Sequence, residues 1–496
     1  MTEQTPSWWI ALLHLQTTES CRVMLVARKS PERPALSVEG SDGTWTHYTF
    51  GELHERATAA AAYALATGPK EGDHTLVALP NGEGLVRAVL ASWMLGRTPL
   101  IVPPEATESE RRTLFLHLGR EKREAFVWSE SRLAAALEQD ISQRLFVPRT
   151  QEPPVTWYLP TGGSTGLPSL LPVGPSPATV LTGARRLMRR TGWSPDAVQL
   201  SLGPLSRTAP LAMCMAGIAG GAHVVMPRRL DPASLESAVR GFAPTWCQLT
   251  PHQMSAIDAH QSLWDALCRS LKGMVHTSAP CPDEVKRRWI SRLGGGRVHE
   301  TYSSTQAVAA TLCDGDEWLA HPGTVGRPFF SNEVLIADQG GRLLPPGGIG
   351  EVYMRSEWTG LSGGRDLRGI LSGGEHFRSV GDLGHTDSDG YLYLMGRLDN
   401  MTVVGGDNIS AREVENVLLT HPDVLDAAVV KRSDPLLGSV LHAVMVPSDL
   451  IRPPGIDGVR GHCLRSLSPY KVPRTVEWVE VLPRSHAGKY ETALHG

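Results

Sequence analysis

A segment rich in glycine and hydroxyl side chains is the strongest chemical signal in the sequence. Residues 161–168 read Thr-Gly-Gly-Ser-Thr-Gly-Leu-Pro and directly follow the apolar run 157–160. Glycine lets backbone N–H groups converge at dihedral angles that other residues avoid, and hydroxyl groups add donors, so this loop suits a polyphosphate. It is not a Walker P-loop, because no Gly-Lys-Ser/Thr follows. Taken alone, the segment also fits a flexible surface turn.

Seven short segments, in one order along the chain, resemble those of the adenylate-forming superfamily of acyl-CoA synthetases, luciferases and nonribosomal peptide adenylation domains. The glycine loop resembles that family's phosphate loop. Residues 300–306 (Glu-Thr-Tyr-Ser-Ser-Thr-Gln) resemble its Tyr-Gly-x-Thr-Glu segment, and residues 323–328 resemble its Gly-x-x-Gly-x-Pro turn. The other four segments are 380–383, 396–399, 405–415 and 482–489. Any one match is weak, but seven in the family's order make a chance resemblance improbable.

The resemblance implies an ATP-dependent ligase. Joining a carboxylate to a thiol or an amine needs a better leaving group than hydroxide. Attack of the carboxylate on the α-phosphorus of ATP supplies AMP in that role. Such an enzyme holds triphosphate, ribose and acid together, mainly by positioning and charge stabilisation. The implied cofactors are ATP and Mg²⁺. The implied partners are a small-molecule acid or other oxyanion, and CoA or an amine as the acceptor.

The resemblance also assigns the nucleotide contacts. Tyr302 matches the aromatic residue beside the adenine, and Thr305 matches the threonine that donates to the α-phosphate. Asp382 matches the carboxylate that accepts from both ribose hydroxyls, a role that suits a carboxylate. Arg397 matches the arginine that closes on the sugar and phosphate side. The residues implied to cradle the β and γ phosphates are Thr161, Gly162, Gly163, Ser164, Thr165 and Gly166.

The C-terminal segments imply a domain that moves. Lys489 matches the lysine that swings in to the bridging oxygen while pyrophosphate departs, although a lysine near a chain end is ordinarily solvated surface. Asp399 matches the hinge at which the small domain rotates between adenylation and transfer poses. In the transfer pose, Gly405 and Gly406 would let a pantetheine arm pass close to the backbone. The same two glycines also fit a plain hairpin turn.

Three positions depart from the family pattern. Ser169 stands where the family usually has lysine, which removes one cation from the pyrophosphate side. Gln306 stands where the family has a glutamate on the magnesium side, and a neutral amide binds magnesium more weakly than a carboxylate. Metal binding is therefore expected to rely on the phosphates or on nearby Glu300. Arg207 stands where an aromatic residue or histidine commonly gates the acid pocket.

The acid itself is not fixed by the sequence. Arg207 is either a surface side chain or a binding residue for an anionic or very small substrate in place of an apolar tail. Trp246 and Ser278 are candidate pocket residues, and Trp246 fits an ordinary core position equally well.

The sequence is compatible with three functions. The favoured one is a ligase that forms an acyl-adenylate and passes the acyl group to CoA or an amine. The second is a relative similar to an ATP-dependent diazotase, which adenylates nitrite for attack by an aryl amine and which fits Arg207 and Gln306. The third is a non-catalytic nucleotide-binding relative, which the presence of Lys489, Asp382 and Arg397 disfavours.

Composition argues against nucleic acid and membrane partners. The 496 residues are 41% hydrophobic and 20% charged, enough for a core and for more than one domain. The net charge of −3 offers no basic surface. No apolar run reaches about 18 residues and no signal peptide is evident, so a cytoplasmic location is expected. Seven cysteines without CxxC spacing favour buried free thiols. The oligomeric state is left open.

Alternating strand and helix patterns must position these residues. Residues 75–80, 85–93 and 98–103 read as strand, helix and strand, and residues 222–226, 234–242 and 245–249 repeat the pattern. This predicts an α/β fold with βαβ units and largely parallel sheets. Residues 332–354 predict an antiparallel β subdomain. The resemblance places an N-terminal AMP-binding domain at 1–396, a hinge at 397–399 and a small mobile α+β domain at 400–496.

Overall fold

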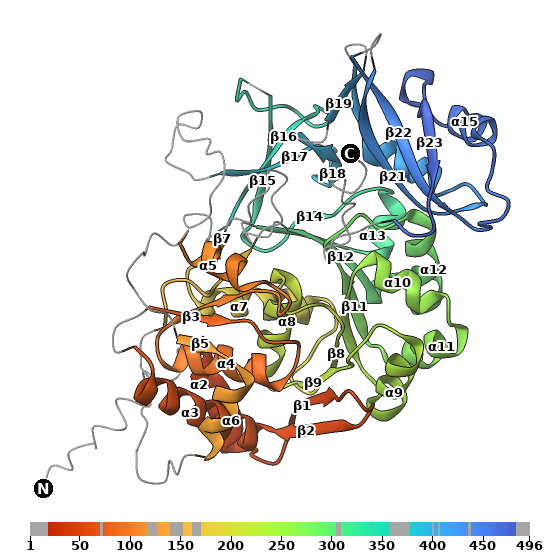
Figure 1. The fold of residues 1–496 in the computed structure, drawn as a ribbon. Coiled ribbons are helices and arrows are strands. Elements are labelled where there is room, and N and C mark those ends of the chain that lie inside the picture. The colour runs from red at the N-terminus through yellow and green to blue at the C-terminus, as the bar shows by residue number, and fades with distance from the viewer. Residues whose placement is uncertain are drawn as a thin grey trace, which may run out of the picture.

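The structure is a computed structural model (Figure 1). It describes residues 18–69, 73–116, 126–138, 152–160, 170–303, 309–338, 340–356, 377–398, 401–404, 407–434 and 438–482.

The first sheet is built from βαβ units, as the sequence predicted. Its strands run in the order β5-β3-β4-β6-β7, all parallel except β7. The predicted unit from residues 75 to 103 is present as β3, α4 and β4. Helix α4 is buried on nearly all sides, because it is mostly apolar and lies in the core shared with the second sheet, and its charged residues Glu83 and Arg87 form an ion pair with each other. The bounds of the strands are β3 (His74–Val77), β4 (Thr98–Ile101), β5 (Phe126–Trp128), β6 (Trp157–Pro160) and β7 (Leu170–Val173). The bounds of the helices are α2 (Glu19–Lys29), α3 (Phe50–Thr67), α4 (Glu83–Met94), α5 (Glu108–Leu116) and α6 (Glu130–Glu138).

The second sheet has nine strands in the order β14-β13-β12-β11-β10-β8-β9-β1-β2. The strands from β12 to β1 in this order are parallel. The second predicted βαβ unit is present, but β8 lies between its strands β9 and β10. The bounds of the strands are β1 (Pro34–Glu39), β2 (Trp45–Thr49), β8 (Val198–Ser201), β9 (His223–Met226), β10 (Trp246–Leu249), β11 (Gly273–His276), β12 (Val298–Ser303), β13 (Ala310–Asp314) and β14 (Arg327–Pro328).

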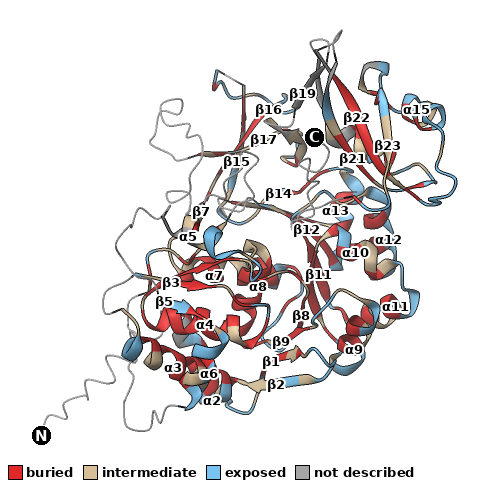
Figure 2. Cartoon of the chain, viewed as in Figure 1, coloured by how far each residue is buried: buried red, intermediate tan, exposed pale blue. Residues whose placement is uncertain are grey.

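Helices cover both faces of this sheet, which explains the apolar character of its strands. Trp246 and Val275 face the core that contains α7 and α8, and Cys247 and Met274 face the core that contains α9 to α12. This alternation follows from the two-residue period of a strand. Figure 2 shows the strands of both sheets as largely buried. The helix bounds are α7 (Pro177–Arg190), α8 (Thr208–Ala219), α9 (Pro232–Phe242), α10 (Pro251–Asp258), α11 (Gln261–Ser270), α12 (Asp283–Leu293) and α13 (Gly315–Ala320), and the 3₁₀ helix η2 spans Gly295–Arg297.

The predicted β subdomain is confirmed. Four antiparallel strands pair in the order β15-β16-β17-β18. They enclose a small apolar core that includes Ile336, Val352 and Leu392. The bounds are β15 (Glu333–Ala337), β16 (Gly350–Arg355), β17 (Arg378–Thr386) and β18 (Leu392–Arg397).

A small α+β unit follows, with its own core, as predicted for the C-terminal domain. Helices α14 and α15 pack on a sheet in which β21 and β22 are antiparallel and β22 and β23 are parallel. This unit, coloured blue in Figure 1, lies beside the β subdomain, where α14 contacts β18. The bounds are β19 (Met401–Val404), β20 (Asp407–Ser410), α14 (Ala411–Leu418), β21 (Val424–Asp434), β22 (Gly438–Pro447), α15 (Ile456–Leu464), the 3₁₀ helix η5 (Pro469–Lys471) and β23 (Thr475–Trp478).

Two predictions about composition can be compared with the structure. Six of the cysteines are free: Cys214, Cys247, Cys268, Cys281, Cys313 and Cys463. Within the described ranges, no helix is both long and apolar enough to cross a bilayer.

Candidate active site

The glycine loop connects two paired strands. Strand β6 is parallel to β4 and antiparallel to β7, and Pro160 at the end of β6 lies opposite Leu170 at the start of β7. Strand β6 therefore ends at the carboxyl edge of a parallel sheet, the edge at which α/β proteins commonly bind ligands. The loop itself lies outside the described residues.

Three residues predicted to hold the nucleotide come from two different sheets and lie close together. The phenol of Tyr302, on β12, donates a hydrogen bond to Oδ2 of Asp382, on β17. Asp382 is paired across the β17–β18 ladder with Arg397. Tyr302 and Asp382 are both half-buried, so they combine a held geometry with access from solvent.

The turn at residues 323–328 joins these two sheets. Thr324 Oγ1 donates to the carbonyl of Leu392 on β18 at 2.8 Å, and the backbone N–H of Leu392 donates to the carbonyl of Gly326 at 2.9 Å. Gly326 has φ +94°, and a Cβ atom there would lie 2.3 Å from the carbonyl carbon of Leu312. Only glycine fits so close an approach, which explains the glycine in this segment. The turn thereby fixes Asp382 relative to Tyr302.

A buried carboxylate that sequence reasoning did not identify supports the segment that precedes Asp382. Glu351, on β16, accepts hydrogen bonds from the hydroxyls of Ser379 and of Tyr353, the latter at 2.9 Å. The Ser379 hydroxyl in turn accepts from the backbone N–H of Gly381 at 3.0 Å. Gly381 has φ +78°, so the backbone turns sharply just before the site residue.

Glu300, a candidate magnesium ligand, forms a buried ion pair with Lys286. Lys286 is 1% exposed, and its Nζ also lies 4.6 Å from the centre of the Trp318 ring. The prediction for Glu300 stays untested, but Lys286 competes with any cation for the same carboxylate.

Register pairing places His276 beside Glu300. Both nitrogens of this fully buried histidine lack a hydrogen-bond partner among the described residues. Burial lowers the pKa of His276 to about 4.

Arg207 and Ser278 follow the carboxyl ends of β8 and β11, two parallel strands that β10 separates in the nine-stranded sheet. Arg207 is the N-cap of α8, and its buried Nε has no hydrogen-bond partner among the described residues. Burial lowers the pKa of Arg207, and the charge of Glu105 opposes the shift. Ser278 is exposed and has φ +78°, an uncommon conformation for a residue other than glycine. Such strain is concentrated at functional sites.

Trp246 lies in the core, which favours the second of its two interpretations. It is fully buried, and its indole N–H donates to the carbonyl of Thr191 at 3.1 Å. Gln248, two residues nearer the carboxyl end of β10, faces the same side of the sheet. Its side chain is 5% exposed, and its amide nitrogen has no partner in the described ranges. The two-residue period of the strand was the signal that could have identified Gln248.

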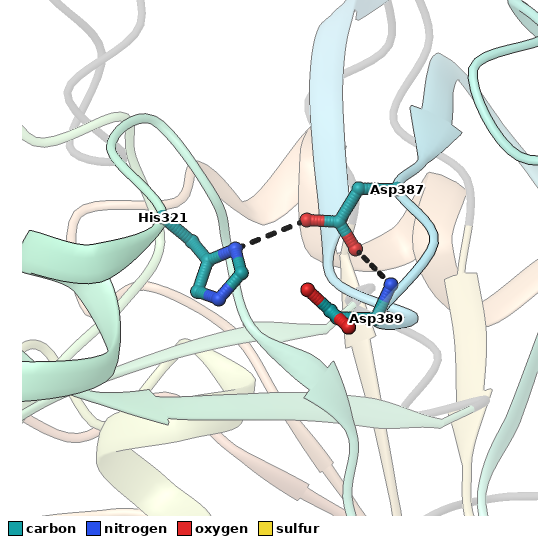
Figure 3. A group of neighbouring side chains, drawn as sticks. All are labelled: His321, Asp387 and Asp389. Carbon is teal, nitrogen blue, oxygen red and sulfur yellow. Dashed lines mark hydrogen bonds and ion pairs between the residues drawn. The ribbon is translucent and has the colours of Figure 1, made fainter.

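A second polar cluster lies at the β17–β18 turn (Figure 3). His321 Nδ1 lies 3.1 Å from Asp387 Oδ2, and Asp389 is close to both. Asp387 also accepts from the backbone N–H groups of Asp389 and Tyr391, at 3.0 and 2.9 Å. These bonds build the turn and give no independent sign of a metal.

A cavity of about 570 Å³ nearby is lined by His299, Arg327, Phe330 and Asp389 among others, but by no residue predicted for the nucleotide or the acid.

Several predicted residues lie outside the described part of the chain. They are Thr161, Gly162, Gly163, Ser164, Thr165, Gly166, Ser169, Thr305, Gln306, Asp399, Gly405, Gly406 and Lys489. The side chain of Arg397 is also not described. Their roles remain predictions.

Comparison with known proteins identifies the family. The sequence model for the AMP-binding enzyme family matches residues 25–120 and 128–362, and the model for the AMP-binding enzyme C-terminal domain matches residues 413–489. The predicted boundary at 397–399 falls between the two models and remains a prediction.

Relatives and solved structures match over nearly the whole chain. The sulfoacetate–CoA ligase of Cupriavidus necator is 28% identical, and the match covers 96% of each chain. The amide bond synthetase McbA from Marinactinospora thermotolerans is 26% identical with a TM-score of 0.76, covering 96% of this chain and 98% of that one. The O-succinylbenzoate coenzyme A synthetase from Bacillus subtilis, in complex with ATP and magnesium, is 21% identical with a TM-score of 0.75, covering 95% and 98%. The chain belongs to the family of AMP-binding enzymes, as an adenylate-forming ligase.

Proposed function

We propose that this ligase activates a carboxylic acid that carries a second anionic group, and that it transfers the acyl group to CoA or to an amine. The observation that carries the proposal is that the guanidinium of Arg207 is half-buried at the end of the site where the acid is expected to bind. Within the described residues its side chain forms no ion pair, and its buried Nε has no hydrogen-bond partner.

The nucleotide end uses the pair found between the two sheets. Asp382 accepts hydrogen bonds from the ribose hydroxyls, and the Tyr302 phenol holds that carboxylate in place while its ring lies beside the adenine. The hydrogen bond between Tyr302 and Asp382 supports this role. The loop at 161–166 cradles the β and γ phosphates with backbone N–H groups and hydroxyls, and Thr305 donates to the α-phosphate.

The reaction proceeds in two steps, formation of the acyl-adenylate and transfer of the acyl group. A carboxylate oxygen of the acid attacks the α-phosphorus, the bond to the bridging oxygen breaks, and pyrophosphate leaves. Lys489 and Arg397 stabilise the charge that develops on the phosphates. In the second step, the thiol of CoA or an amine attacks the acyl carbon and loses a proton. The acyl C–O bond breaks, and AMP leaves with the oxygen that came from the acid.

Magnesium, when bound, neutralises charge on the triphosphate. Gln306 contributes at most a neutral amide oxygen, and Glu300 is paired with Lys286. These two predicted ligands would therefore offer little free carboxylate, and the phosphate oxygens would supply most of the coordination.

Arg207 selects the acid by charge. A guanidinium presents several donors in a planar fork that matches carboxylate and sulfonate oxygens. The related ligase from Cupriavidus necator is named for sulfoacetate, which has a sulfonate besides its carboxylate. An acid of this class would pair its distal anion with Arg207 and present its carboxylate to the α-phosphate.

The test is acid-dependent exchange of pyrophosphate into ATP with matched pairs of acids. Sulfoacetate is compared with acetate, and succinate with butyrate, so that each pair differs in the second anion. We expect the dianions to be preferred in the wild type. Arg207→Leu should lower their kcat/KM by about 10- to 100-fold, the worth of a charged hydrogen bond. The monoanions should be unaffected.

The exposed Arg240, which pairs with Glu236 on its own helix, supplies the control Arg240→Leu. An equal loss for both members of each pair would refute the assignment of Arg207 to the acid. A parallel assay with nitrite and an aryl amine tests the alternative. AMP formed only in that assay would replace the carboxylic acid by nitrite as the substrate.

A further inference from the structure

Asn81 links the two large sheets at the acid end of the site. It follows β3 of the five-stranded sheet, and its partners follow β8 of the nine-stranded sheet. Its Nδ2 donates to the carbonyl of Gly203 at 2.9 Å, and its Oδ1 accepts from the backbone N–H of Leu205 at 2.8 Å. A single side chain thus satisfies one backbone acceptor and one backbone donor of the same turn, more than 100 residues away along the chain.

This turn leads directly into Arg207. The backbone N–H of Arg207 donates to the carbonyl of Pro204 at 3.1 Å, and the side chain of Leu205 is fully buried. Gly203 packs tightly on the first turn of α8, because a Cβ atom there would lie 2.4 Å from Cγ of Pro210. The turn is therefore compact, and its position sets the position of the Arg207 backbone.

Gly203 also lies near Gln248, whose amide nitrogen has no hydrogen-bond partner among the described residues. The Oε1 atom of Gln248 lies 3.9 Å from the Cβ position of Gly203. The turn held by Asn81 thus lies between Gln248 on β10 and Arg207 at the start of α8. A shift of the turn would change both walls of the acid site together.

We propose that Asn81 is a positioning residue for the acid: by clamping the turn from Gly203 to Leu205, it holds Arg207 where the distal anion of the acid binds. The inference rests on the proposed role of Arg207. Asn81 is exposed, so its two bonds contribute little to global stability but restrict a short turn. Small displacements of a binding group are costly for a reaction that depends on orientation.

The test compares Asn81→Ala with wild type in the pyrophosphate exchange assay. We expect the KM for sulfoacetate to rise about 10-fold, since two backbone hydrogen bonds are lost. The KM for ATP and the melting temperature should stay unchanged. Asn81→Asp keeps the acceptor for Leu205 but sets a carboxylate oxygen against the carbonyl of Gly203, so its KM for the acid should rise at least as much.

Asn332 supplies the matched control, because its Nδ2 also donates to a backbone carbonyl, that of Ala310, at 2.9 Å. Asn332→Ala should leave the KM for the acid unchanged. Asn81→Ala in the Arg207→Leu background should have no further effect on that KM. An additive effect would overturn the proposal that Asn81 acts through Arg207, as would an equal rise in both KM values. A different result would refute the proposed substrate class: an unchanged kcat/KM for the dianionic acids in Arg207→Leu alone. The two proposals can therefore fail separately.

Discussion

The phenol of Tyr302 donates a hydrogen bond to the carboxylate of Asp382, although the two residues lie 80 positions apart and on different sheets. The bond crosses from the nine-stranded sheet to the β subdomain. Because the turn at 323–328 also joins these sheets, the position of Asp382 is fixed from two sides. The ribose contact that we assign to Asp382 therefore depends on Tyr302.

Replacing Tyr302 by phenylalanine tests this dependence. The ring remains, but the donor to Asp382 is lost, so the carboxylate is less well oriented. We expect the KM for ATP to rise about 10-fold, the worth of a hydrogen bond to a charged group at a half-buried site, and the KM for the acid to stay the same. Tyr391→Phe is the control, since that phenol also donates to a carboxylate, Glu317, at 3.1 Å. An unchanged KM for ATP in Tyr302→Phe would show that the bond does not serve nucleotide binding.

From the buried ion pair of Lys286 and Glu300, we expect each single variant to be destabilised and the double variant to recover most of the lost stability. Lys286→Met removes the ammonium that pairs with the buried carboxylate of Glu300, and Glu300→Gln removes the carboxylate that pairs with the buried ammonium of Lys286. Each should destabilise the fold by about 3–5 kcal/mol, whereas the double variant should recover most of that loss. Thermal unfolding of the three variants measures the coupling.

The same variants test the metal role of Glu300. If pairing with Lys286 is its main role, the magnesium dependence of pyrophosphate exchange should be the same in the double variant as in the wild type. A large increase in the magnesium concentration needed by the double variant would restore Glu300 as a ligand.

His276 predicts a loss of stability in mild acid. Burial lowers the pKa of His276 to about 4 in the folded state, whereas the unfolded chain takes up the proton near pH 6.5. Its contribution is therefore fully present above about pH 6.5 and is lost as the pH falls from there towards 4. At pH 5 the loss amounts to about 2 kcal/mol. The charges of Glu300, Lys286 and His299 also act on this group.

His276→Leu should remove this part of the pH dependence. The melting temperature of the variant should fall less between pH 7 and pH 5 than that of the wild type. At pH 7 the variant should be no less stable, since it removes two buried nitrogens that have no hydrogen-bond partner within the described ranges. The exposed His260 gives the control His260→Leu. The explanation fails if His276→Leu follows the wild-type pH profile.

We expect a substitution of Lys489 to affect the two half-reactions differently. Lys489→Ala should slow formation of the adenylate by orders of magnitude, because charge stabilisation by one positioned group is commonly worth about 10²- to 10³-fold. Transfer from a preformed acyl-adenylate should remain largely intact. Rapid-quench assays of each half-reaction make the measurement. An equal loss in both would contradict the role assigned to Lys489.

Local sequence patterns were enough to predict the main strands and helices, and the sheet edge at which the candidate site lies. The apolar alternation predicted β3, α4 and β4, and Asp382 and Arg397 are neighbours because one hairpin carries both. The link from Tyr302 to Asp382 could not be read from the sequence, since it depends on how two sheets are joined.

Burial of polar residues was also hidden from sequence reasoning. Lys286 lies in a helix with several charged residues, so its position resembles a solvated surface site. It is buried because Glu300 and the Trp318 ring lie against its ammonium group. Asn81 and Glu351 were missed for the same reason, because the backbone and hydroxyl groups that they bind come from distant parts of the chain.

Transfer of labelled oxygen tests most directly whether this chain forms an acyl-adenylate. The protein is incubated with ATP, magnesium, an acceptor and an acid whose carboxylate carries ¹⁸O, and the products are analysed by mass spectrometry. We expect one ¹⁸O atom in each AMP formed, because the acid's oxygen stays on the phosphorus when the acyl group leaves. Label in pyrophosphate or phosphate, or AMP without label, would contradict this expectation.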